Sequence, residues 1–118
     1  DGNRKRERRN AQLALENAEW ERNDLEISLR ARLADLWQAY CNNLRLLSLE
    51  RENLTVAREN HLIARERFLL GDLAGIEIRE AQNSLLDAEE RLLIAEYDTK
   101  VCEISLLQIS GMITRYLE

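Results

Sequence analysis

Apolar and small residues in the second half of the chain recur at alternating steps of three and four positions. Side chains with this spacing share one face of an α-helix. The alternation of leucine with alanine is typical of a heptad seam that packs closely against an antiparallel partner. The pattern predicts a helix over residues 76–110 with the following seam: Ile78, Ala81, Leu85, Ala88, Leu92, Ala95, Thr99, Cys102, Leu106 and Ile109.

The first half predicts a longer helix, because nothing interrupts helix formation from about residue 4 to residue 70. At ~1.5 Å per residue this helix would extend for ~100 Å. Both predicted helices carry more than one apolar row, and such a helix contacts neighbours on more than one side. A lone hairpin cannot cover all these rows, so we expect a wall or barrel of helices, or at least an oligomer. The additional rows are Leu47, Leu54 and Phe68 with His61 in their gap; Leu49, Val56, Ile63 and Leu70; Ala57 and Ala64; and Leu86, Leu93 and Leu107.

Residues 71–75 form the predicted turn, which joins the two helices into an all-α, antiparallel hairpin. The chain has no proline and four glycines. Gly71 fits the left-handed position just past a helix end, where a Cβ would clash. Gly111 is predicted to end the returning helix, which leaves residues 111–118 as a tail.

The two cysteines lie 61 positions apart in the sequence, on opposite sides of this turn. The antiparallel register places Cys41 and Cys102 within about one helical turn of being opposite. Two interpretations stay open: two buried small apolar residues, or an interhelix disulfide if the Cα atoms come within ~7 Å.

Composition and charge argue against several classes of function. The chain has 17 basic and 22 acidic residues, a net charge of −5, which gives no support for nucleic-acid binding as the main task. No apolar run approaches the ~20 residues of a membrane-spanning helix. The cysteines and the single histidine, His61, lack metal-ligand spacing, so we expect no metal or cofactor and a packed, structural His61. No catalytic constellation is present, so we expect no enzyme. Asp87 and Arg91 have the spacing of a surface ion pair.

The segment around the turn resembles the helix-turn-helix tip of TolC-like outer-membrane efflux proteins. Its order is an aromatic and apolar run, Gly71, an acidic residue, and an Ala-Gln pair that opens a leucine and alanine helix (Arg65 to Gln82). Asp1 to Arg4 resembles the segment that enters the family's long helix, and Leu107 to Gly111 resembles the end of its returning helix. The resemblance therefore extends over essentially the whole chain.

The resemblance implies a trimeric α-helical barrel, in which three protomers with two such hairpins each form a twelve-helix tunnel. The tunnel would be a passive export conduit in the periplasm of a Gram-negative bacterium, held in the outer membrane by parts outside this sequence. Its partners would be a periplasmic adaptor and an inner-membrane pump. By the same resemblance, the adaptor would contact Leu70, Gly71, Asp72 and Leu73, and Glu77 and Glu80 would form charged rings at the entrance of the lumen.

Two residues depart from the family's pattern at the tip. Ala74 stands where a serine or threonine is common, and Gly75 adds backbone freedom beside Gly71. Alanine cannot accept the capping hydrogen bond of the second helix, so we expect the cap from Asp72 or from water, at a cost of ~1 kcal/mol.

Two other functions compete with this interpretation. A coiled-coil scaffold or adaptor hairpin would also use long antiparallel helices, but adaptor hairpins sit between strand-forming flanks that are not visible here. A basic-region coiled coil that binds nucleic acid is suggested by the basic cluster from Arg4 to Arg9. The residues that follow do not form a leucine heptad: Leu13, Trp20, Ile27 and Ala34.

Overall fold

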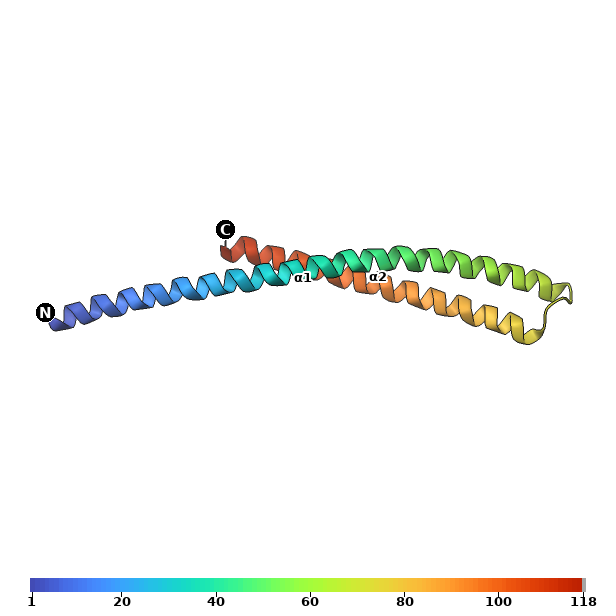
Figure 1. Cartoon of the computed structure of the whole chain (residues 1–118), viewed down its shortest axis with the longest axis horizontal. Helices are drawn as coiled ribbons and strands as arrows, with labels where there is room; N and C mark the ends of the chain where they lie inside the picture. Colours follow the sequence, from blue (N-terminus) through green and yellow to red (C-terminus); the bar gives the residue numbers. More distant parts are fainter. Residues whose placement is uncertain (118) are drawn as a thin grey trace.

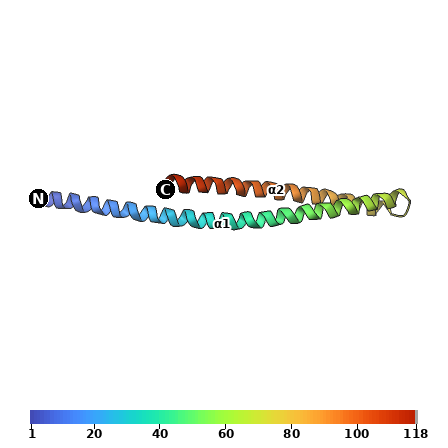
Figure 2. The same cartoon turned by 90° about the horizontal axis from the view of Figure 1, so that it is seen from above.

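The chain forms an extended hairpin of two helices in a computed structural model that describes residues 1–117. Helix α1 spans Gly2–Leu69 and helix α2 spans Gly75–Leu117. They run antiparallel and pack along each other in a rod of 102 × 22 × 15 Å (Figures 1 and 2). The all-α hairpin and the place of its turn are therefore confirmed.

The predicted seam of α2 is the face that contacts α1, and all ten of its positions are buried or half-buried. The facing seam of α1 follows the same steps of three and four. It combines two of the predicted rows, the row of Leu47 with the row of Ala57, into one heptad stripe. Its members that are buried or half-buried are Leu29, Leu33, Leu36, Tyr40, Asn43, Leu47, Glu50, Leu54, Ala57, His61 and Ala64.

The remaining apolar rows face away from this seam. The α1 row Leu49, Val56, Ile63 and Leu70 is at least half exposed at every position, and so is the α2 row Leu86, Leu93 and Leu107. The hairpin therefore covers one apolar stripe on each helix and leaves another uncovered, as the several rows in the sequence predict.

Helix α1 is much longer than its partner, and its first part has no helix beside it (Figure 1). Residues 1–25 are exposed at every position, and α2 comes to lie alongside only beyond them. This overhang is about 36 Å long. It carries large apolar side chains at Leu13, Leu15 and Trp20, all about half exposed or more.

The C-terminal boundary differs from the prediction. Helix α2 does not end at Gly111 but continues to Leu117, so the predicted tail is the last part of the helix. A glycine inside a helix costs about 1 kcal/mol relative to alanine. The seam continues past it, with Ile109 buried and Ile113 and Leu117 half-buried, and this packing offsets the cost.

Replacing Gly111 with alanine should stabilise the chain by about 0.5–1 kcal/mol, because alanine has less backbone freedom to lose on folding. A Cβ at Gly111 would meet no atom within 4 Å, so no clash opposes the gain. Urea unfolding followed by circular dichroism at 222 nm measures the change. An unchanged or lower midpoint would mean that the helix ends at this residue.

Candidate functional site: the tip and the polar part of the seam

The turn at the tip is a Schellman motif. Gly71 has φ of 78°, which confirms the predicted left-handed position. The Asp72 N–H donates to the carbonyl of Arg67 at 2.9 Å, and the Gly71 N–H donates to the carbonyl of Phe68 at 3.0 Å. These two bonds are the pair that defines the motif, and they satisfy carbonyls that the end of α1 leaves without a helical partner.

An ion pair on the surface links the last turn of α1 to the loop that follows it. Arg67 Nε lies 3.7 Å from Asp72 Oδ2, and an Arg67 amino group donates to the Asp72 carbonyl at 3.4 Å. A Schellman motif often has an apolar contact at these two positions. Both side chains are more than half exposed, so the pair contributes at most about 1 kcal/mol.

The start of α2 does not use the cap that we expected from Asp72, because that carboxylate faces Arg67 instead. The helix begins where the Ala74 carbonyl accepts the N–H groups of Glu77 and Ile78, at 3.1 and 3.3 Å. Within residues 1–117, no side chain caps the first amides of α2. This end of the helix therefore depends on water.

The residues with a predicted adaptor contact lie at the outermost point of the rod. The Leu70 side chain is 83% exposed and the neighbouring Leu69 is also largely exposed, whereas Leu73 is half-buried. Two adjacent leucines in water at the end of a hairpin are an unfavourable arrangement for an isolated chain. The tip therefore presents an apolar end to its surroundings.

The predicted gate charges lie together along one face of the tip. Glu77 and Glu80 line a groove of about 550 Å³ between the helices, which we call the acidic groove. Its other walls are polar or small, apart from Val56. They consist of Asn53, Val56, Ala57, Asn60, Ala81, Ser84 and Arg91.

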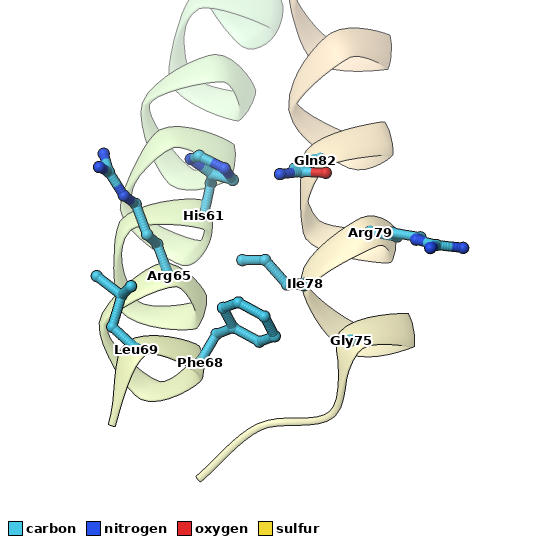
Figure 3. Close-up of a pocket in the computed structure, with 8 residues that line it drawn as sticks. All are labelled: His61, Arg65, Phe68, Leu69, Gly75, Ile78, Arg79 and Gln82. Atoms are coloured by element: carbon cyan, nitrogen blue, oxygen red, sulfur yellow. The ribbon is translucent and has the colours of Figure 1, made fainter. Parts of the chain in front are cut away.

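A second groove, which the sequence did not predict, lies between the helices near the turn and shares no residue with the first. It has a volume of about 590 Å³, and we call it the basic groove. Figure 3 shows His61, Phe68, Ile78 and Gln82 directed toward the space between the helices, and Arg65 and Arg79 directed outward on its two sides. His61 is half-buried in the seam, which agrees with the structural role expected for it.

The seam contains a charged pair at the end of the acidic groove that lies farther from the turn. Arg91 Nε donates to Glu50 Oε2 at 3.2 Å, and Glu50 is only 8% exposed. The predicted pairing of Arg91 with Asp87 on the surface is therefore wrong. The signal in the sequence was the heptad spacing, since Glu50 comes seven residues before Ala57 and thus belongs to the seam.

A polar layer lies one heptad away from this pair. The side-chain amide of Asn43 donates to Cys102 Sγ at 3.1 Å, and the Thr99 hydroxyl donates to the Ala95 carbonyl at 2.7 Å. The seam passes through Tyr40 and Asn43, which leaves Cys41 on its flank. Cys41 and Cys102 are both half-buried free thiols in this structure.

The described residues, 1–117, contain no cluster of side chains suited to hold a metal ion. Neither of their helices has a stretch apolar enough to cross a membrane. No family model, curated protein or solved structure matches the chain.

Replacing Gly71 with alanine should destabilise the hairpin by about 1 kcal/mol or more, because a Cβ is strained at a φ of 78°. The Gly111→Ala variant is the matched control, since it adds the same methyl group to a helical glycine. The difference between the two urea midpoints isolates the backbone strain. Equal shifts in the two variants would contradict a left-handed Gly71.

Replacing Arg91 with glutamine should destabilise the hairpin by about 1–3 kcal/mol, because it leaves the Glu50 carboxylate buried without its cation. Arg79→Gln is the control, since Arg79 has no ion pair within residues 1–117 and should change stability by less than about 0.5 kcal/mol. The double variant Glu50→Leu with Arg91→Leu should recover the loss. A loss of the same size in both single variants would refute this role for the ion pair.

Proposed function

We propose that this chain is a wall segment of a periplasmic export conduit of the TolC-like type, in which several hairpins close into a trimeric α-helical barrel. In this role the chain provides shape and charge and no chemical conversion. The tip faces a periplasmic adaptor and an inner-membrane pump, and the other end points toward the outer membrane.

The observation that carries the proposal is the uncovered apolar face on the back of α2. Its side chains project away from α1, at helical positions opposite to the buried seam, and all are between 44% and 69% exposed. A helix with apolar stripes on opposite sides fits between two neighbours, as in a wall of helices. The back face consists of Leu86, Leu93, Ile94, Tyr97, Val101, Ile104 and Leu107.

The amount of exposed surface supports a large interface. The chain exposes 9623 Å², whereas a compact monomer of 13.8 kDa would expose about 6,600 Å². The excess of about 3,000 Å² on one chain follows in part from the rod shape, and it exceeds the roughly 1,000–2,500 Å² that each partner contributes to an obligate interface, so it leaves room for more than one neighbour. Part of the exposed surface is the apolar back face of α2, which an elongated scaffold with a polar surface would not need.

The charges of the tip fit the entrance of such a conduit. With the acidic groove toward the lumen, three or more copies of Glu77 and Glu80 would form a ring of negative charge. Rings of carboxylates attract cations and disfavour anions at a constriction. The opposite face, with the basic groove, would then lie on the outside of the wall.

Replacing Leu93 and Ile104 with glutamate should abolish self-association while the helix content is kept, since both side chains face away from the seam. Glu90→Gln is the control, because it alters a polar residue of the same helix. Sedimentation equilibrium of the 118-residue chain measures the association, and circular dichroism measures the helix. A wild-type chain that stays monomeric at millimolar concentration would overturn the helical wall.

The export step has its own test in cells that make the protein. Leu93→Glu should raise the accumulation of ethidium several-fold, because a broken wall cannot carry compounds out. Cells with the Glu90→Gln variant should accumulate no more dye than the wild type. An association defect without any change in accumulation would retain the wall and reject this export role.

A further inference from the structure

The two grooves near the tip differ in the sign of their charge. The acidic groove carries Glu77 and Glu80, and the basic groove carries Arg65 and Arg79. They are lined from different sides of the seam and share no residue. A charged partner that approaches the tip is therefore attracted to one face of the hairpin and repelled from the other.

The basic groove lies where the seam of α1 becomes exposed near the tip. Phe68 continues the seam of α1, four residues after Ala64, yet it is 44% exposed. Leu54, two heptads before it in the same row, is only 5% exposed. The exposed Phe68 ring thus forms an apolar floor of the groove, and the buried Ile78 side chain reaches its edge from α2 (Figure 3).

The arginines beside this floor have no acidic partner. Arg67 pairs with Asp72 across the turn, but Arg65 and Arg79 form no ion pair within residues 1–117. In a chain with a net charge of −5, two uncompensated guanidinium groups flank the one uncovered aromatic ring near the tip. Guanidinium groups bind carboxylates through paired, directional hydrogen bonds.

We infer that the basic groove is the docking site for an acidic amphipathic helix of a partner protein. An apolar side chain of that helix packs on the exposed face of the Phe68 ring, and its carboxylates reach Arg65 and Arg79. Coiled coils use the same arrangement, in which an apolar side chain packs into the centre of the contact and charged side chains pair on both sides of it. The inference rests on the proposed role of the tip as the docking end of the conduit, and it assigns the partner's chemistry.

The probe for this inference is a synthetic three-heptad helical peptide with leucine at every seventh position and glutamate on both sides of each leucine. Titration into the ¹⁵N-labelled chain should shift the amide signals of Phe68 and Ile78. The same peptide with lysine in place of glutamate should bind at least tenfold more weakly. Equal binding of the two peptides would refute the charge recognition.

The matched variants are Arg65→Glu with Arg79→Glu, and Arg45→Glu with Arg32→Glu, which changes the net charge equally outside the groove. The first pair should weaken peptide binding at least tenfold, and the second less than twofold. Equal losses would mean attraction by net charge alone and would overturn the site. Signals of Phe68 that shift with the chain's own concentration, without peptide, would assign the groove to a second copy and also overturn it.

The test of peptide binding is independent of the test of self-association in the proposed conduit. Arg65 and Arg79 are not among the apolar residues of the back face, and Arg79 lies one heptad beyond its first leucine, Leu86. Their substitution removes no apolar contact of the wall and should leave sedimentation unchanged. A chain that binds the peptide but does not self-associate would retain the groove and reject the wall. A chain that self-associates but does not bind the peptide would retain the helical wall and reject the docking site in the basic groove.

Discussion

The structure depends on one narrow contact, the heptad seam between two antiparallel helices. A seam of this kind covers a single stripe on each helix. The sequence carries at least two apolar stripes on each, so the hairpin leaves much of its apolar surface in water. The exposed rows, the excess surface area and the open groove at the tip all follow from this mismatch between what two helices can cover and what the chain contains.

The polar groups within the seam fix the register of the two helices, which a purely apolar seam specifies poorly. A repeat of leucine and alanine can slide by a heptad with little loss of packing. The layers of Asn43 with Cys102 and of Glu50 with Arg91 oppose sliding, because it would leave the half-buried Asn43 amide and the buried Glu50 carboxylate without their partners. Leucine pairs at these places would pack at least as well, but they would specify the register less strictly.

Much of the fold could be predicted from periodicity and from a single glycine. The seam of α2 and the left-handed Gly71 follow from spacing and from steric rules that act locally. The misplaced end at Gly111 came from the same local rule, which tertiary packing of Ile113 and Leu117 overrides. The sites were less predictable. The Glu50–Arg91 pair and the basic groove join residues distant in sequence, and both depend on the register and on how far the helices separate at the tip.

The overhang of α1 has a consequence for assembly. Residues 1–25 have no neighbour within the hairpin, and a lone helix in water gains little from its own hydrogen bonds. Its order must come largely from whatever packs against Leu13, Leu15 and Trp20. For this segment folding and binding are then one equilibrium, so the molecule that covers the overhang also decides how much of α1 is helical.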